Sequence, residues 1–277
     1  MTYRIPTILD VLPMLTDLKG KIIVTKIGGS VMRSKETLES FAKDIATMKA
    51  FGIKPIVVHG GGPEINQMLE KLGIQTKFQS GYRVTDKETL EVVLMVLAGK
   101  TNKHLVKILN DFKANAVGVC GVDANLFECE KDLTFGDIGF VGKIVSVNCD
   151  FVLDLLYKGY IPVIATVGSG KDGIYNINAD VAAAYLAKAL KAEKLIILTD
   201  VDGVLVNGEV VKSLTISQAQ HLIETSVAKE GMLPKLTGVI DAVKDGVKSV
   251  HIINGKIEHA VLLEIFGMTL GTIIKEG

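Results

Sequence analysis

The sequence feature that most constrains the fold is a run of three glycines, residues 60–62, separated by His59 alone from an apolar stretch, residues 56–58. Short apolar runs of this kind are typical of buried parallel strands. Pro63 follows the glycines and suits the first turn of a helix, where its missing N–H is no loss. Apolar residues then recur at helical spacing, at Ile65, Met68, Leu69 and Leu72. The stretch predicts a buried strand, a tight turn and a helix. Its N–H groups would form an anion site, although the turn could also serve only as a connection.

The same strand-to-turn pattern recurs elsewhere in the chain. An apolar strand pattern also ends in a turn that contains glycine at residues 26–30 (KIGGS) and at residues 198–204 (LTDVDGV). Strand patterns alternate with helical ones over most of the chain, which predicts a mainly parallel sheet with helices on both faces. Ligands of such sheets bind beyond the carboxyl ends of the strands. Lys26, directly before two glycines, is therefore a candidate phosphate contact, and its alternative is a solvated strand end.

Composition narrows the class of protein. Of the 277 residues, 48% are hydrophobic, which suits strands buried on both faces. Lys plus Arg equals Asp plus Glu at 31 each, so no general attraction to nucleic acid or to an anionic membrane is expected. No apolar run approaches the ~20 residues of a spanning helix, and the first residues lack a signal-peptide layout. Three scattered cysteines fit neither a disulfide framework nor a zinc site. A cytoplasmic setting is the expectation.

Other motifs in the chain carry less weight. Gly168, Gly170 and Gly173 match the dinucleotide-binding spacing, but no helix pattern follows at once, so the match is weak. Residues 99–101 (GKT) lack the earlier glycine of a P-loop and lie in a helical pattern. Thr85, with Glu88 three residues later, predicts a capping box at the start of that helix. The five histidines show no metalloprotease spacing, and no protein-held metal is expected.

Ten stretches of the chain together resemble the amino acid kinase family, and within it the N-acetylglutamate kinases. In chain order they are KIGGS (26–30), VVHGGGPEIN (57–66), GYRVTD (81–86), LAGKTNK (97–103), GFVGKI (139–144), GYIPVIA (159–165), NINAD (176–180), LTDVDGV (198–204), GMLPK (231–235) and HAVLLEIF (259–266). The glycine turns are shared with related kinases. GYRVTD and NINAD, together with GMLPK, are much more specific.

The resemblance implies an α/β fold, a three-layer αβα sandwich with a central mainly parallel sheet. It implies phosphorylation of the side-chain carboxylate of N-acetyl-L-glutamate by ATP, a step of arginine biosynthesis. It also implies two lobes. Residues 1–175 would bind the acyl amino acid and form a dimer, with a helix in residues 1–18, and residues 176–277 would bind ATP.

The resemblance also implies the catalytic residues. Lys26 and Lys235 would contact the transferring phosphoryl group from the nucleophile and leaving-group sides. Asp180 would hold both lysines by charge-assisted hydrogen bonds. Backbone N–H groups would complete the phosphate cradle, at Gly28, Gly29 and Gly61.

For the acyl amino acid, the resemblance implies Arg83, which suits bidentate capture of the α-carboxylate. Asn176 would hold the same end, and the NINAD motif adds Asn178. The attacked carboxylate would lie at Gly61 and Gly62. The chain departs from the family pattern around this pocket, at Ser80, Tyr82 and Thr166.

For the nucleotide, the resemblance implies a loop that contacts ribose and adenine, with the residues Asp200, Val201, Gly203 and Leu205. Mg²⁺ would be held mainly by the ATP phosphates and water, as its hydration preference favours.

A regulated branch of the family is also implied. The helix before the first strand, HAVLLEIF and residues 271–274 (GTII) are similar to the arginine-inhibited, hexameric enzymes. In that branch N-terminal helices interlace dimers and arginine binds beside them, near the C-terminal end of the chain. The expected partners are therefore N-acetyl-L-glutamate, arginine and further copies of this chain.

Two other functions stay open at this point. A kinase of the same fold could act on an N-blocked 2-aminoadipate in lysine biosynthesis, because one methylene discriminates by only about 1–3 kcal/mol. A non-catalytic, arginine-responsive binding protein is the alternative from another class. A dehydrogenase, resting on the lone glycine pattern, is a distant third.

Overall fold

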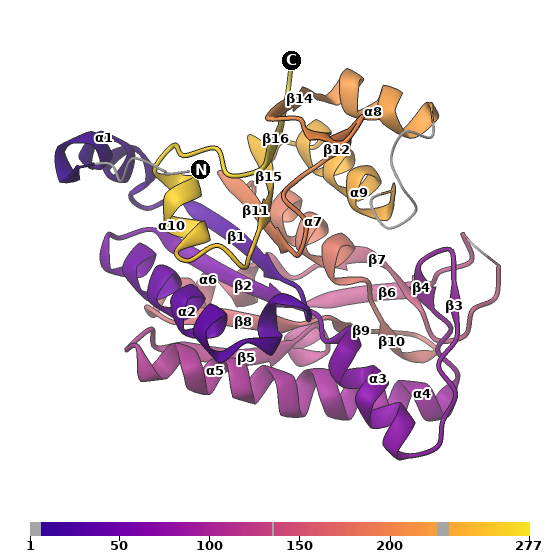
Figure 1. The fold of residues 1–277 in the computed structure, drawn as a ribbon. Coiled ribbons are helices and arrows are strands. Elements are labelled where there is room, and N and C mark those ends of the chain that lie inside the picture. The colour runs from indigo at the N-terminus through magenta and orange to yellow at the C-terminus, as the bar shows by residue number, and fades with distance from the viewer. Residues whose placement is uncertain (1–6, 135, 226–232) are drawn as a thin grey trace.

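The computed structural model describes residues 7–134, 136–225 and 233–277, and its centre is an eight-stranded sheet between two layers of helices (Figure 1). In spatial order the strands are β14 (Ser213–Thr215), β16 (Thr272–Lys275), β15 (Ser249–Asn254), β11 (Lys194–Thr199), β1 (Ile22–Ile27), β2 (Lys54–His59), β8 (Ile161–Ala165) and β5 (Ala116–Cys120). The six strands from β15 to β5 are parallel, and β16 runs antiparallel to β15. The predicted αβα sandwich is confirmed.

Helices follow the strands as predicted. They are α1 (Ile8–Leu18), α2 (Lys35–Ala50), α3 (Gly62–Lys71), α4 (Lys87–Leu94), α5 (Asn102–Asp111), α6 (Cys149–Tyr157), α7 (Ala179–Ala189), α8 (Ile216–Glu224), α9 (Leu233–Lys244) and α10 (Ala260–Ile265). Helices α6, α7 and α9 pack on one face of the sheet, and α2, α5 and α10 lie on the other.

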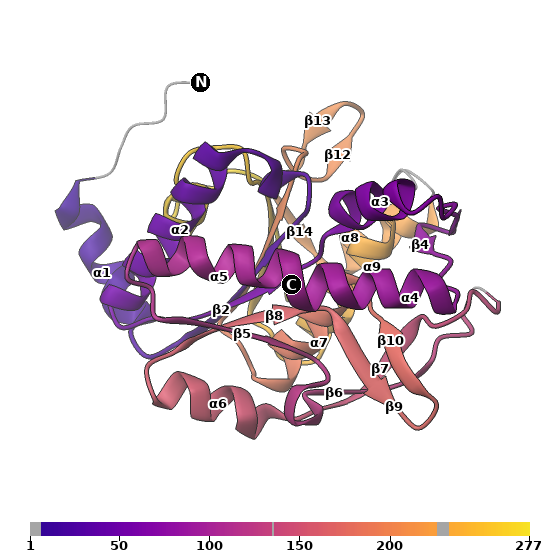
Figure 2. The same ribbon diagram turned by 90° about the horizontal axis from the view of Figure 1, so that it is seen from below.

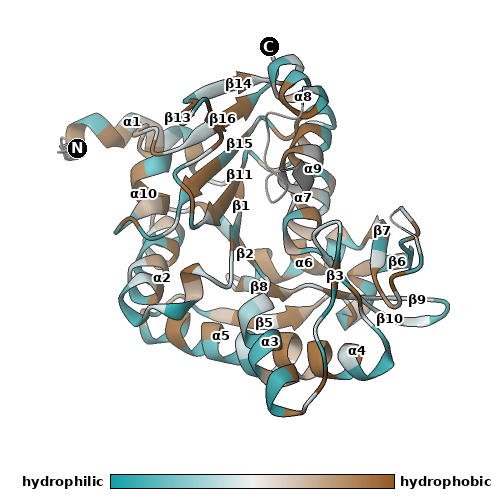
Figure 3. Ribbon diagram, turned by 45° about the vertical axis from the view of Figure 1, so that its right-hand side comes forward, coloured by the Kyte–Doolittle hydropathy of each residue, from teal (hydrophilic) through white to brown (hydrophobic). Residues whose placement is uncertain are grey.

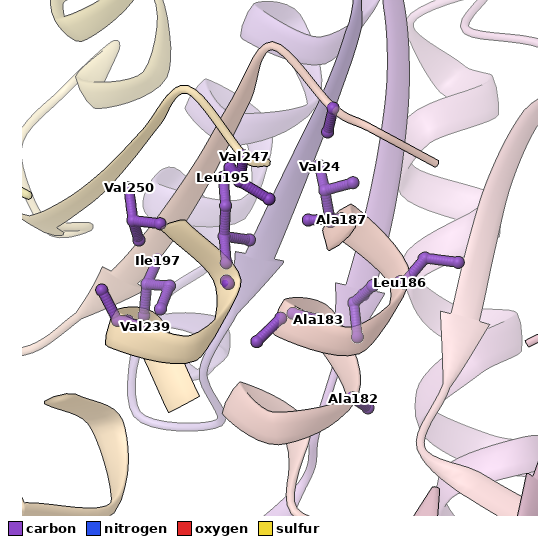
Figure 4. Packing of buried hydrophobic residues seen from close by; sticks show 14 of the residues in the cluster. Val24, Ala182, Ala183, Leu186, Ala187, Leu195, Ile197, Val239, Val247 and Val250 are labelled. Atoms are coloured by element: carbon purple, nitrogen blue, oxygen red, sulfur yellow. The ribbon is translucent and has the colours of Figure 1, made fainter. Parts of the chain in front are cut away.

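The core has two halves because successive side chains of a strand point to opposite faces of the sheet. On β1, Val24 packs with the α7 and α9 layer, whereas Ile23 and Ile27 pack with the α2 layer. Figure 4 shows the first half, where Ala183 and Ala187 of α7 lie close to Val24 and Leu195. Small alanine side chains let this helix approach the sheet closely, and this fixes the position of its first turn.

Smaller sheets surround the carboxyl ends of the central strands. One sheet contains β10 (Gly173–Asn176), β9 (Val167–Gly170), β6 (Phe127–Lys131) and β7 (Gly142–Val147), and β6 pairs antiparallel with β7 (Figure 2). Two hairpins are β3 (Phe78–Gln79) with β4 (Tyr82–Arg83), and β12 (Leu205–Val206) with β13 (Glu209–Val210).

The dinucleotide-like glycines belong to one of these pairs rather than to a strand-to-helix turn. Gly170 lies opposite Gly173 in the antiparallel pairing of β9 with β10. A Cβ atom on Gly168 would come 2.7 Å from Cys129 Sγ, and one on Gly170 would come 2.0 Å from the Cys129 carbonyl oxygen. Close packing against β6 therefore accounts for glycine at these two positions.

The helical pattern around residues 99–101 is helical in the structure, as a π-helical segment, Met95–Thr101, between α4 and α5. The prediction of Thr85 as the N-cap is wrong by one residue. Asp86 caps α4 by accepting a hydrogen bond from Thr89 N at 2.8 Å. Thr85 instead is fully buried, and its hydroxyl donates to the Arg83 carbonyl oxygen at 2.8 Å.

Hydrophobic residues concentrate on the strands of the large sheet, whereas the β3–β4 hairpin is largely hydrophilic (Figure 3). Within the described ranges, no helix is long and apolar enough to cross a membrane. Helix α1 carries exposed apolar side chains, because Leu9 is 75% and Leu12 is 46% exposed.

Candidate active site

Two glycine turns meet at the carboxyl ends of β1 and β2. These strands are parallel neighbours, with Ile27 opposite His59, so the turns that follow them lie side by side. A Cβ atom on Gly29 would come 2.4 Å from Pro63 Cδ, so a side chain at this position would collide with the first turn of α3. The two turns are glycine-rich because they approach each other this closely, and together they expose backbone N–H groups near a helix N-terminus.

Lys26 and Asp180 form a largely buried ion pair at this junction. Lys26 Nζ lies 2.7 Å from Asp180 Oδ1, and both side chains are mostly buried, at 7% and 13% exposure. Lys26 comes from the end of β1, and Asp180 comes from the first turn of α7. The structure thus brings together two of the predicted catalytic residues that are far apart in the sequence.

Asn178 fixes the start of α7 and therefore the position of Asp180. Its side-chain oxygen accepts hydrogen bonds from the backbone N–H groups of Asp180 at 2.9 Å and Val181 at 3.3 Å. This is an N-cap, which satisfies two donors that a helix start leaves without a partner. The predicted substrate-binding residue Asn178 is a helix cap in the structure, and it also lines the pocket beside it.

A pocket of about 170 Å³ adjoins the glycine turn of α3. Its lining includes the predicted residues Gly61, Gly62, Arg83, Asn176 and Asn178, and adds Gly60, Ile65, Phe78, Gly81, Tyr82, Leu97, Val141, Thr166, Ile177 and Ala179. The lining combines apolar side chains with a few polar groups, which is typical of sites for small organic molecules. We call this cavity the acceptor pocket.

Arg83 provides the positive charge of the acceptor pocket. It is only 7% exposed, its Nη2 donates to the Gly62 carbonyl oxygen at 3.3 Å, and its guanidinium lies 4.8 Å from the ring centre of Phe78. Burial lowers the pKa of Arg83 to about 10, so the side chain stays charged at neutral pH. Its Nη1 is buried and has no hydrogen-bond partner among the described residues. A buried guanidinium with an unpaired donor is well suited to bind a carboxylate.

Thr85 and Asn176 connect the two sides of the acceptor pocket. Asn176 Nδ2 donates to Thr85 Oγ1 at 3.2 Å, and Thr85 in turn donates to the Arg83 carbonyl oxygen. The β4 strand that carries Arg83 is thereby tied to β10. Tyr82 lies in the same lining, and burial, followed by the charges of Asp132 and Asp180, raises the pKa of its phenol.

The predicted nucleotide loop lies between β11 and β12, beyond the carboxyl end of β11. Asp200 and Leu205 are exposed, and Asn254 Nδ2 donates to Asp202 Oδ1 at 2.7 Å. Gly203 has a φ of +141°, and a Cβ atom there would come 2.7 Å from Thr272 Oγ1. The same Thr272 hydroxyl accepts from the backbone N–H of Val204 at 2.8 Å, which anchors the loop to β16.

For the predicted catalytic residue Lys235, the structure describes the backbone but not the side chain. Its backbone belongs to α9, and its side chain lies outside the described part of the chain, as do Gly231 and Met232 of the same motif. The predicted contact between Lys235 and Asp180 stays a prediction.

Comparison with known proteins decides the family. Residues 21–254 match the model of the amino acid kinase family. This chain belongs to the amino acid kinase family. Members of this family are phosphotransferases that use ATP, so the glycine turns and the Lys26–Asp180 pair lie where phosphate chemistry is expected.

Among curated relatives of this amino acid kinase are two named acetylglutamate kinase. The protein from Kosmotoga olearia is 50% identical over 273 residues, which cover 98% of this chain and 97% of that protein. The protein from Thermoanaerobacter pseudethanolicus is 48% identical, with 96% of this chain and 91% of that protein covered. The similarity therefore spans nearly the full length of both proteins.

Solved structures of similar fold include an N-acetylglutamate synthase from Neisseria gonorrhoeae complexed with coenzyme A and N-acetyl-glutamate. It superposes with a TM-score of 0.87 at 25% identity and covers 97% of this chain, which corresponds to 62% of the synthase chain. A carbamate kinase from Giardia lamblia has a TM-score of 0.68 at 17% identity, which shows the fold alone.

The structure also reveals a polar network that the sequence patterns did not indicate. His59 is fully buried next to the glycine turn of this kinase, its Nδ1 donates to the Gly60 carbonyl oxygen at 2.9 Å, and its Nε2 accepts from Asn102 Nδ2 at 3.1 Å. Burial lowers the pKa of His59 to about 4, so the imidazole is neutral. Asn102 also donates to the Val163 carbonyl oxygen at 2.9 Å, which links α5 to β8.

Proposed function

We propose that this chain transfers the γ-phosphoryl group of ATP to the side-chain carboxylate of N-acetyl-L-glutamate in arginine biosynthesis. The observation that carries the proposal is the Lys26–Asp180 pair at the junction of two glycine turns, next to a pocket that contains the buried Arg83. The nearly full-length relatives named acetylglutamate kinase support this choice of acceptor.

Phosphoryl transfer to a carboxylate needs no general base, because the nucleophile is already an anion. The difficulty is to bring two anions together and to stabilise the charge on the transferring group. Lys26 provides a buried positive charge at this point, and Asp180 holds its ammonium in one orientation. Lys235 would provide a second charge from the nucleotide side. The N–H groups of Gly28, Gly29 and Gly61 would contact the phosphoryl oxygens.

The site would orient the acceptor by contacts with both of its carboxylates. Its α-carboxylate would pair with Arg83, whose Nη1 has no other partner in the described ranges, with Asn176 beside it. Its side-chain carboxylate would then lie at Gly61 and Gly62, next to Lys26. Phe78 covers the guanidinium, which reduces competition from water for the Arg83 contact.

The nucleotide would bind beyond β11, with Asp200, Val201, Gly203 and Leu205 around its ribose and base. Mg²⁺ would be held mainly by the phosphates and by water, where it neutralises phosphate charge. On this proposal residues 176–277 bind ATP, residues 1–175 bind the acyl amino acid and contribute the dimer contacts, and the enzyme works in the cytoplasm.

The test of this function is detection of the product. An acyl phosphate reacts with hydroxylamine to give a stable hydroxamate, so the purified chain with ATP, Mg²⁺, N-acetyl-L-glutamate and hydroxylamine should form the hydroxamate together with ADP. Omission of N-acetyl-L-glutamate is the control. ADP formation that does not depend on the acceptor, with no hydroxamate, would contradict the proposal.

We propose further that the enzyme is a hexamer of three dimers joined through α1 and is inhibited by arginine near α1 and the C-terminal end of the chain. Exposed Leu9 and Leu12 on α1 support its role as an interface helix. A Cβ atom on Gly267 would come 2.9 Å from Met14 Cε, so α1 packs against the turn that leads to the last strand. A ligand bound at this turn would be sensed by α1.

Light scattering tests this assembly. Deletion of residues 1–18, or the double substitution Leu9→Glu and Leu12→Glu, should convert hexamers into dimers and abolish inhibition by arginine. Leu133→Glu is the matched control, because Leu133 is similarly exposed, at 62%, but lies far from α1 in the sequence, in the loop between β6 and β7. An unchanged mass after deletion of α1 would remove this part of the proposal.

A further inference from the structure

Thr166 has a buried hydroxyl that nothing in the described structure satisfies. The residue is 1% exposed, and its Oγ1 has no hydrogen-bond partner among the described residues. A buried hydroxyl without a partner destabilises the folded state, because it has lost its hydrogen bonds to water. Folded proteins seldom keep such a group without a reason, and a ligand-binding role is one of the few reasons that explain it.

The position of Thr166 in the fold indicates which ligand its hydroxyl would contact. The residue follows β8, whose last residue Ala165 lies opposite His59 of β2 in the parallel pairing. Thr166 therefore lies beside Gly60, where the glycine turn begins, and it lines the acceptor pocket. Its backbone oxygen accepts from Ile177 N at 3.0 Å, so the main chain is held in place while the hydroxyl stays unpaired.

Other buried threonines show that this is not a general property of the core. The hydroxyls of Thr85 and Thr272 donate to backbone carbonyl oxygens at 2.8 and 2.6 Å. Thr25 and Thr101 have unpaired hydroxyls like that of Thr166, but neither lines the acceptor pocket. Within the described ranges, the pocket thus combines two unpaired buried donors, Arg83 Nη1 and Thr166 Oγ1.

We propose that the Thr166 hydroxyl donates a hydrogen bond to the side-chain carboxylate of the bound acceptor and so determines its affinity. Arg83 holds the α-carboxylate at one end of the pocket, and Thr166 orients the reacting carboxylate at the Gly60 end. The assignment rests on the proposed function, because it takes the acceptor to be an N-acyl amino acid with a side-chain carboxylate.

The substitution that tests the role is Thr166→Val, which keeps the shape and removes the hydroxyl. The KM for N-acetyl-L-glutamate, and its Kd by calorimetry without nucleotide, should rise about tenfold, because hydrogen bonds to charged groups are strong. The kcat should change by less than about threefold, since the bond is made to the ground state as well as to the transition state. The melting temperature of the ligand-free protein should not fall, because an unpaired group has been removed.

Thr25→Val is the matched control. Thr25 is also fully buried with an unpaired hydroxyl, but it faces the α2 side of β1 with Ile23 and Ile27. It should leave KM unchanged. A second pair, Thr166→Ser and Thr166→Ala, differs by the hydroxyl alone and keeps the test valid if the valine variant does not fold. The serine variant should bind the acceptor about tenfold more tightly than the alanine variant.

A ligand without the reacting carboxylate identifies the contacted group. N-acetyl-L-2-aminobutyrate should inhibit the wild type and Thr166→Val equally. Equal KM values for N-acetyl-L-glutamate in these two proteins, or an inhibition constant for the analogue that changes as much as KM, would overturn the assignment. Absence of turnover by the wild type would reject the proposed function together with it, whereas turnover with unchanged KM rejects only the role of Thr166.

Discussion

The proposed acceptor side and the proposed nucleotide side of the site are built differently. On the acceptor side, Arg83 and Thr166 are buried, and the glycine turns are so close that Gly29 has no room for a side chain. On the nucleotide side, Asp200 and Leu205 are exposed. The acceptor pocket is therefore lined by buried polar side chains, whereas the predicted nucleotide loop is an open surface. Substitutions should accordingly have larger effects on the acceptor side, where each polar group is desolvated and hard to replace.

The largest effect is expected for Lys26→Met. On the proposed function, this substitution removes the charge that would stabilise the transferring phosphoryl group, and it leaves Asp180 without its Lys26 partner. The kcat should fall about 100- to 1,000-fold or more, with a much smaller change in KM, because the contact strengthens in the transition state. Steady-state kinetics with both substrates provide the measurement.

Lys107→Met is the control for Lys26→Met. Lys107 Nζ lies 2.6 Å from Asp111 Oδ1, a similar distance, but both side chains are exposed. Such surface pairs contribute about 0–1 kcal/mol, so activity and stability should hardly change. Equal activity loss in the two variants would argue for a general effect of lysine removal rather than a role for Lys26.

The next effect concerns the pH dependence of stability and His59, the buried histidine that directly precedes Gly60 of the acceptor pocket. His59 in the folded protein has a pKa of about 4, whereas the unfolded chain takes up this proton near pH 6.5. The free energy of unfolding should therefore fall as pH drops from about 6.5 to about 4, by at most about 3 kcal/mol from this residue. Urea unfolding across this range should show the slope in the wild type. His59→Gln should reduce it, and the same change at the exposed His221 should not.

A change of KM for one substrate alone is expected for Arg83→Lys. Lysine keeps the charge but loses the planar pair of donors and the stacking on Phe78. The KM for N-acetyl-L-glutamate should rise about 10- to 100-fold, whereas the KM for ATP should stay within about twofold. Arg33→Lys, at an exposed arginine, should change neither value. An equal rise in both KM values would contradict the division of the site into two sides.

The smallest effect is expected for Gly203→Ala on the nucleotide side. Its φ of +141° and the short distance to Thr272 Oγ1 disfavour any side chain there. The KM for ATP should rise a few-fold, because backbone strain of this kind costs about 1–3 kcal/mol. Part of this cost lowers the stability of the folded protein, and the rest weakens the binding of ATP. Gly208→Ala has a φ of +86° but open space, and it should lower stability without raising this KM. A larger rise in KM for the acceptor than for ATP would be unexpected.

Much of the backbone of the site could be predicted from the sequence. The glycine turns after β1 and β2 follow from apolar runs that end in glycine, because only a few chain geometries fit such a pattern. The proximity of Lys26 and Asp180 could not be derived from spacing, since the two residues are far apart in the chain. The resemblance to a known family supplied that pair, and the structure places the two side chains in contact.

The side-chain network around the pocket could not be predicted. Thr85 has the spacing of a helix cap, yet it is buried and joins Arg83 to Asn176, because Asp86 occupies the cap position one residue later. The sequence pattern does not distinguish His59 from the other histidines. Its neutral state depends on burial and on Asn102 from a distant helix. Such contacts depend on tertiary packing, and local patterns carry no signal for them.

The most direct test of the account is acceptor selectivity. ADP release should be measured with N-acetyl-L-glutamate, N-acetyl-L-2-aminoadipate and L-glutamate, each with and without arginine, and compared as kcat/KM. We expect the highest kcat/KM for N-acetyl-L-glutamate by at least about tenfold, because a pocket of fixed shape discriminates one methylene by about 1–3 kcal/mol. Preference for the aminoadipate derivative, or no turnover of any of the three, would contradict it.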